Sequence, residues 1–147
     1  MKLRSITLAT IAVCVASAAF AQCPVQMNTF NARRIWGNGY DMVAKVANDS
    51  GKEITAVKFD ISFIDATLDE HSLFQTYTWD KTIKADSKND RLSWRRPYIA
   101  DVRSYPFAKI TLLKIVYADG TTFENSADKP ECAPLYDEHY QRKHGAK

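Results

Sequence analysis

The clearest alternation of apolar and polar positions runs from Val57 to Asp65, where every second residue is apolar over most of a strand length. A similar run from Tyr40 to Ala47 precedes it. The segment Asn48 to Lys52 lies between the two runs and is rich in residues that favour turns. Two alternating runs on either side of such a turn predict a β-hairpin.

A second hairpin is predicted from Ile110 onward. The segment Ile110 to Tyr117 is apolar on both faces apart from Thr111 and Lys114, as expected of a central strand. Asp119-Gly120 follows and favours a two-residue turn, after which Thr122-Phe123 begins the return strand.

Weaker strand patterns cover residues 25–35, 73–83 and 91–95, and Gly37-Asn38-Gly39 marks the end of the first. About seven short strands with turns between them, and no helical pattern between strands, predict an all-β antiparallel sandwich. We assign residues 22–132 to this single domain. Residues 133–147 are a C-terminal tail, in which Ala133 to Arg142 could form a short helix.

Two turn motifs carry a resemblance to a known family. Asn48-Asp49-Ser50-Gly51-Lys52 joins two strand patterns, and Val116 to Gly120 opens the later hairpin as a Val-x-x-Asp-Gly segment. In these features the chain resembles the immunoglobulin-like modules of exported bacterial proteins, such as the FxLYD type. In such hairpins a glycine often follows the position of Asp65, whereas this chain has Thr67-Leu68-Asp69. The resemblance implies an immunoglobulin- or fibronectin-III-like sandwich, and such modules usually have no assigned activity.

The first 21 residues have the pattern of a secretory signal peptide. Lys2 and Arg4 give a positive start, Ile6 to Val15 is mostly apolar, and Ala19-Phe20-Ala21 offers small residues for cleavage. The apolar run is short for a membrane-spanning helix. We expect residues 1–21 to be removed, leaving a periplasmic or secreted protein without a transmembrane segment; the alternative is an uncleaved anchor or a buried helix.

Removal of this segment changes the charge and the cysteine count. The chain has 20 Lys and Arg against 17 Asp and Glu, and loss of Lys2 and Arg4 reduces its net charge from +3 to +1. This near-neutral balance argues against nucleic acid as a partner. Cys14 is lost too, so Cys23 and Cys132 remain and are expected to form a disulfide in an oxidising compartment. Two free thiols or an intermolecular bridge are the alternatives.

An aromatic and cationic segment is the candidate ligand-binding surface. Arginines beside aromatic rings suit sugars, aromatic-rich peptides or anionic polymers. Arg33-Arg34-Ile35-Trp36 repeats the pairing. The alternative is that each tryptophan fills the core of the sandwich. The candidate residues are Trp79, Trp94, Arg95, Arg96 and Tyr98.

Catalytic and metal-binding patterns are sparse. Asp69-Glu70-His71 could bind a divalent metal or orient a base, although a solvated acidic turn explains the same residues. His139 and His144 lie five residues apart, which is not the spacing that places two ligands on one helical face. The sequence has no Gly-x-Ser-x-Gly motif, and a disulfide would leave no cysteine nucleophile. We therefore expect no enzyme activity, no cofactor and no metal.

These patterns together predict an exported binding or structural module of the bacterial envelope. Its expected partner is an envelope protein or a cell-wall polymer. The alternative is a small periplasmic metal-handling protein or hydrolase that uses Asp69, Glu70 and His71.

Overall fold

The structure, a computed structural model, describes residues 23–37, 39–79, 81–96, 105–126, 128 and 131–145, with the side chains of residues 72–79 and 96 left out. The expected signal peptide and Tyr98 lie outside the described residues. No helix within these ranges is long and apolar enough to cross a membrane. The elements in chain order are β1 (Val25–Ile35), β2 (Gly39–Asn48), β3 (Ile54–Ile64), β4 (Glu70–Trp79), β5 (Asp90–Arg96), β6 (Phe107–Tyr117), β7 (Thr122–Glu124), β8 (Leu135–Tyr136) and α1 (Glu138–His144).

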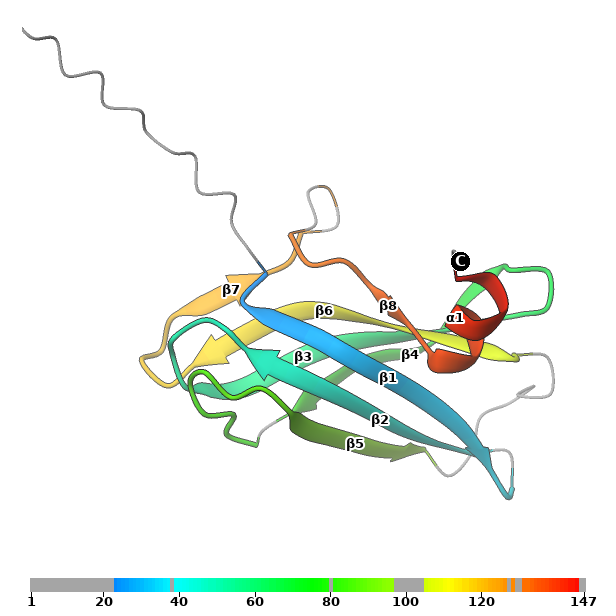
Figure 1. Cartoon of the computed structure of the whole chain (residues 1–147), viewed down its shortest axis with the longest axis horizontal. Coiled ribbons are helices and arrows are strands. Elements are labelled where there is room, and N and C mark those ends of the chain that lie inside the picture. The colour runs from blue at the N-terminus through cyan, green and yellow to red at the C-terminus, as the bar shows by residue number, and fades with distance from the viewer. Residues whose placement is uncertain are drawn as a thin grey trace, which may run out of the picture.

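Two antiparallel sheets pack face to face in a sandwich-like arrangement (Figure 1). One sheet has the strand order β1-β2-β5, and the other has the order β4-β3-β6-β7, with β8 also paired to β6. The all-β antiparallel sandwich predicted from the sequence is thus confirmed. The described part of the chain has eight strands where about seven were predicted, because the two-residue β8 carries no periodic pattern of its own. The immunoglobulin- or fibronectin-III-like type stays a prediction.

The second predicted hairpin is present. β6 and β7 pair through Val116 and Thr122. The loop is one residue longer than the predicted two-residue turn, because the amide of Tyr117 donates to the carbonyl of Thr121 and leaves residues 118–120 between them; Gly120 ends this loop with a φ of 81°. A positive φ of this size is open to glycine without steric cost, so the turn chemistry fixes the hairpin. β6 lies between β3 and β7, as predicted for a strand that is apolar on both faces.

The first predicted hairpin is wrong, although both of its strands exist. β2 pairs with β1 and β5, whereas β3 pairs with β4 and β6, so the chain crosses from one sheet to the other between Asn48 and Ile54. Alternation shows that a strand has one buried face but not which strand lies beside it. Here the buried faces of β2 and β3 oppose each other across the core, and hydrogen-bonded pairing between them is excluded.

Asn48 holds this crossover together. Its amide nitrogen donates to the carbonyl oxygens of Lys52 at 2.7 Å and Lys84 at 3.0 Å, while its side-chain oxygen accepts from Ser50. The side chain is fully buried. Asn48-Asp49-Ser50 also fits the Asn-x-Ser pattern of a glycosylation acceptor, but in the folded chain the amide nitrogen of Asn48 is buried and already donates twice.

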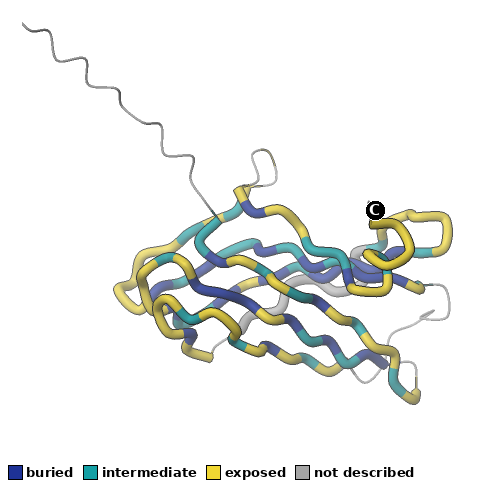
Figure 2. Tube along the Cα trace, viewed as in Figure 1, coloured by how far each residue is buried: buried dark blue, intermediate teal, exposed yellow. Residues whose placement is uncertain are grey.

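The core lies between the two sheets and is built from the residues of each strand that face inward. Along β2 and β3 the buried positions alternate with more exposed ones, as the tube in Figure 2 shows. The largest fully buried side chains include Phe30, Met42, Phe59, Phe63, Leu92, Ile110 and Leu112. Both sheets therefore contribute to one continuous apolar interior.

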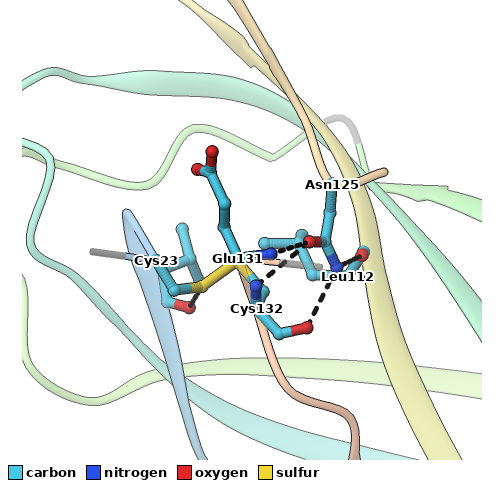
Figure 3. Close-up of a disulfide and its surroundings, with 6 residues drawn as sticks. Cys23, Leu112, Asn125, Glu131 and Cys132 are labelled. Carbon is cyan, nitrogen blue, oxygen red and sulfur yellow. Dashed lines mark hydrogen bonds between the residues drawn. A yellow bond between two sulfur atoms is a disulfide. The ribbon is translucent and has the colours of Figure 1, made fainter. Parts of the chain in front are cut away.

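Cys23 and Cys132 form a disulfide with a Cα–Cα distance of 4.9 Å, as predicted (Figure 3). It joins Cys23, two residues before β1, to the segment that follows β7, 109 residues later in the chain. Asn125 fixes that segment, donating to the carbonyl oxygens of Leu112 and Cys132 and accepting from the amides of Glu131 and Cys132. The side chain of Asn125 thus uses both of its donors and accepts twice at its oxygen.

The C-terminal tail returns to the sandwich. β8 pairs with β6, and Asp137 then caps α1 by accepting from the amide of Tyr140 at 2.7 Å. The same carboxylate accepts from the amide of Ala108 in β6 at 2.8 Å. A short helix was predicted within Ala133 to Arg142, and α1 lies at Glu138–His144 because Asp137 supplies the N-cap.

Candidate binding surface

The outward face of the β1-β2-β5 sheet brings several cationic side chains together. The core-facing residues Met42, Ala44 and Val46 of β2 are buried, so the alternate residues of the strand point outward. The same alternation and the pairing registers bring nine outward residues into three rows of three. We call these nine residues the cationic face: Arg33, Asp41 and Arg95; Asn31, Val43 and Ser93; Thr29, Lys45 and Arg91.

The first row is held by an ion pair. Asp41 lies between Arg33 and Arg95, and Arg95 donates from Nε and Nη2 to its two carboxylate oxygens at 2.7 and 3.2 Å. The hydrogen bond from Arg95 holds the pKa of Asp41 below its ordinary value, and the charges of Arg95 and Arg33 act in the same direction. The same bond raises the pKa of Arg95. This row therefore has a fixed geometry and keeps one positive charge in excess.

The third row adds two further positive charges, because Lys45 and Arg91 are paired across β2 and β5 and both are exposed. Within the described ranges, Lys45, Arg91 and Arg33 have no carboxylate partner within the 4.0 Å of an ion pair. The cationic face thus carries four positive charges and one negative charge. An anion that approached it would meet cations not already neutralised by the protein.

The face is hollowed. One depression of about 460 Å³ lies over Asn31, Val43 and Lys45, and another of about 330 Å³ lies over Val43, Ser93 and Arg95. Asp41, Val43 and Arg91 line both of them, so the two depressions adjoin along the middle of the sheet. Glu138 of α1 stands at the rim, where it accepts from Asn31 at 3.2 Å.

The structure separates the residues that the sequence grouped as a ligand surface. Arg95 lies on the cationic face, whereas Trp94 points the other way and packs edge-on against Phe59, with ring centroids 5.6 Å apart. Trp94 is half-buried, and part of it lines the smaller depression. Trp79 ends β4 and so belongs to the other sheet. The side chains of Trp79 and Arg96, and all of Tyr98, lie outside the described part, and the binding role of the five residues stays a prediction.

Trp36, in the segment that repeats the pairing of arginine and tryptophan, is almost fully exposed. It lies in the turn that joins β1 to β2 and is 98% exposed. Arg33, three residues earlier, lies on the cationic face. An exposed indole at the end of a cationic sheet face is suited to contact a ligand that extends beyond it.

The acidic segment around His71 forms a self-contained turn. Nε2 of His71 lies 2.8 Å from Oδ2 of Asp65, whose Oδ1 accepts from the amides of Thr67 and Asp69. Hydrogen bonds from Thr67 and then His71 hold the pKa of Asp65 well below its ordinary range. Glu70 is bound by Lys109 instead. Glu70 and His71 therefore have separate partners, and no group of three His, Cys, Asp or Glu that could hold a metal is found among the residues that the structure describes.

Comparison with known proteins adds no functional information. No family model matches the sequence, and no curated protein matches it. A solved structure that is similar carries the description "X-ray structure of Northeast Structural Genomics Consortium target SoR45". It is 10% identical, the match covers 78% of this chain and 86% of that chain, and the TM-score is 0.42. Values this low carry no argument about the present chain.

Sequence reasoning found Arg95 and Arg33 but not Asp41, Lys45 or Arg91. The sequence feature that could have identified them is the set of polar positions in the strand patterns, since Asp41 and Lys45 alternate with the buried residues of β2. Alternation alone gives no reason to prefer these cations to the solvated charges of any other strand. They become a site only because β1, β2 and β5 are neighbours.

Proposed function

We propose that this chain is an exported, non-enzymatic binding or structural module of the bacterial envelope, and that the cationic face is its ligand surface. One observation carries the proposal: Arg33, Lys45 and Arg91 stand on a hollowed, exposed sheet face without an ion-pair partner among the described residues. Surplus charge of one sign in a depression attracts a partner of opposite charge and orients it. The partner is an envelope protein or a cell-wall polymer with negative charge.

Export is supported by two independent features. The first 21 residues have the composition of a signal peptide, and the Cys23–Cys132 disulfide is of a kind that persists in the periplasm and outside the cell. The mass of the protein recovered from the cell envelope tests this directly, because cleavage after Ala21 and loss of two hydrogens predict one defined value.

A non-enzymatic role is supported by the state of the residues that resemble catalytic groups. His71 is engaged by Asp65, and Glu70 by Lys109. Both domain cysteines are in the disulfide. No specific observation favours the alternative of a metal-handling protein or hydrolase at Asp69, Glu70 and His71, and we do not propose it.

The proposal is tested by capture of partners from an envelope extract. The wild-type protein is compared with a Lys45→Gln/Arg91→Gln variant and with a Lys58→Gln/Lys84→Gln variant, which removes the same charge from exposed positions outside the cationic face. We expect the first variant to lose the partners that the wild type captures and the second to retain them. Identical partner sets for all three proteins would refute the cationic face as the ligand surface.

A further inference from the structure

We propose that the ligand of the cationic face is an anionic saccharide, a short run of sugar units that carry carboxylate, sulfate or phosphate groups. This inference rests on the proposed function, since it names the ligand of the same surface. It follows from how charged and neutral side chains are arranged over the nine residues.

The positive charges lie at the two ends of the face. Arg33 and Arg95 stand in the first row, and Lys45 and Arg91 stand in the third, four residues further along the paired strands. Strand geometry puts these rows roughly 14 Å apart and spreads the face about 10 Å across its three strands. Anionic groups that are spaced along a ligand therefore match this face better than a single compact anion does.

The row between the cations is neutral and suits hydroxyl groups. Asn31 and Ser93 offer amide and hydroxyl groups on either side of Val43, whose side chain supplies an apolar patch in the floor. A sugar ring presents hydroxyl groups at its edge and C–H groups on its face, so it can use both kinds of contact at once. A polyanion without hydroxyl groups or apolar faces would make few contacts with the neutral row.

Asp41 favours a saccharide over a polymer with a phosphate at every unit. Its carboxylate lies between two arginines, and hydrogen bonding from Arg95 keeps it ionised. It lowers the net charge of that row to +1, so the row suits one anionic group and not several closely spaced ones, and its remaining lone pairs can accept from sugar hydroxyls. The nine residues also include no aromatic ring on which a nucleic acid base could stack.

The size of the face argues against a protein partner that binds through it alone. A stable protein interface buries about 800 Å² on each partner. A surface of roughly 10 Å by 14 Å is several times smaller and matches a few sugar units. The adjoining depressions of about 330 and 460 Å³ together form a continuous groove that could hold such a ligand.

Isothermal titration calorimetry at low ionic strength tests the ligand class. The probes are tetragalacturonate and a heparin tetrasaccharide, with uncharged maltotetraose, tetraglutamate and a short oligothymidylate as comparisons. We expect both charged saccharides to bind, with affinities that fall as salt is added. Maltotetraose, tetraglutamate and the oligothymidylate should bind about tenfold more weakly or not at all.

Four variants test where the charged saccharides bind. Lys45→Gln/Arg91→Gln and, separately, Arg33→Gln should weaken the charged saccharides, the double variant by about tenfold. Lys58→Gln/Lys84→Gln should leave their affinity unchanged. Asp41→Asn should narrow the difference in affinity between the charged saccharides and tetraglutamate, because it removes the negative charge that repels a densely charged peptide, while the amide oxygen of asparagine can still accept from hydroxyls. Unchanged urea midpoints confirm that each variant is folded.

The outcomes separate this inference from the proposed function. Equal binding of tetraglutamate or oligothymidylate would overturn the saccharide assignment and leave the cationic face as a general anion surface. If no probe binds, yet capture from envelope extract still depends on Lys45 and Arg91, the ligand class is wrong and the surface is right. If neither probe binding nor capture depends on these residues, both proposals fail.

Discussion

Trp94 and Arg95 are consecutive residues of β5 that act on opposite sides of the sheet. Trp94 packs against Phe59 in the interior, while Arg95 donates two hydrogen bonds to Asp41 on the outer surface. The period of two in a strand imposes this division. The segment therefore combines a packing residue with a surface residue, and the two are separable by mutation.

We expect Trp94→Ala to lower the free energy of unfolding by about 2–3 kcal/mol, since it removes a half-buried ring from the edge of the core. Arg95→Ala should leave the urea midpoint near that of the wild type, because its ion pair is exposed. Urea denaturation followed by tryptophan fluorescence or circular dichroism measures both. Equal stability losses in the two variants would contradict the division of roles.

The disulfide should contribute a large share of the stability. Replacement of Cys23 and Cys132 by serine opens a loop with a sequence separation of 109 residues, and the chain-entropy model sets the loss at up to about 4–5 kcal/mol. Urea denaturation of the double variant measures the loss. The wild type in reducing agent should behave like the variant. Two free thiols detected in the untreated exported protein would show that the bond is not formed.

Asn125→Ala should destabilise the segment that carries Cys132. The substitution leaves two carbonyl oxygens and two amides without the partner they have now, and we expect a loss of about 2–3 kcal/mol. Asn28→Ala is the matched control, because exposed Asn28 makes a single hydrogen bond, to the carbonyl of Lys88. Thermal denaturation should separate the two variants clearly, and similar midpoints would count against the role assigned to Asn125.

Asp65 should make stability depend on pH in the acid range. Hydrogen bonds from Thr67 and His71 lower its pKa in the folded chain below the ordinary value of 3.8. A lowered pKa means that the folded state favours the carboxylate, so this contribution is present above pH 3.8 and is lost as the pH falls below it. Urea midpoints measured on acidification should therefore fall more steeply for the wild type than for Asp65→Asn. Parallel curves would refute the contribution.

Leu68→Gly should stabilise the protein. Leu68 has a φ of 71° in the β3–β4 turn and is 48% exposed, so glycine would relieve the backbone strain at the loss of little packing. We expect the free energy of unfolding to rise by about 1 kcal/mol. Ala66→Gly, in the same turn at a φ that is not positive, should lower it instead. A fall in both variants would show that the leucine side chain makes a needed contact.

The sequence predicts the positions of individual strands better than it predicts which strands pair with one another. The range Val25–Ile35 agrees with β1, and the Asp119-Gly120 turn correctly predicts the β6–β7 hairpin, because local turn chemistry suffices there. The Asn48 turn has equally strong local chemistry, yet it serves a crossover between sheets. A turn of this kind can form a hairpin within one sheet or a crossover between two sheets. Only the packing of the two buried faces against each other decides between them.

The candidate site was predictable only in part, because the sequence does not show which strands are neighbours. Arg95 was identified from its sequence neighbours, whereas its geometric partner Asp41 is 54 residues away and lies beside it only through β2–β5 pairing. Trp94 was grouped with Arg95 because sequence proximity was taken for spatial proximity. The strand predicted over residues 91–95 already implies that Trp94 and Arg95 point to opposite faces, because successive side chains of a strand alternate.

The placement of the two cysteines sets an order of events during synthesis. The ribosome makes Cys23 first and supplies Cys132 only after 109 more residues, a delay of about 5–20 s at ordinary elongation rates. During that interval the thiol of Cys23 has no partner within its domain. The bond therefore cannot form before the residues of β1 to β7 have been synthesised, and any chain that stops before Cys132 keeps Cys23 without its partner.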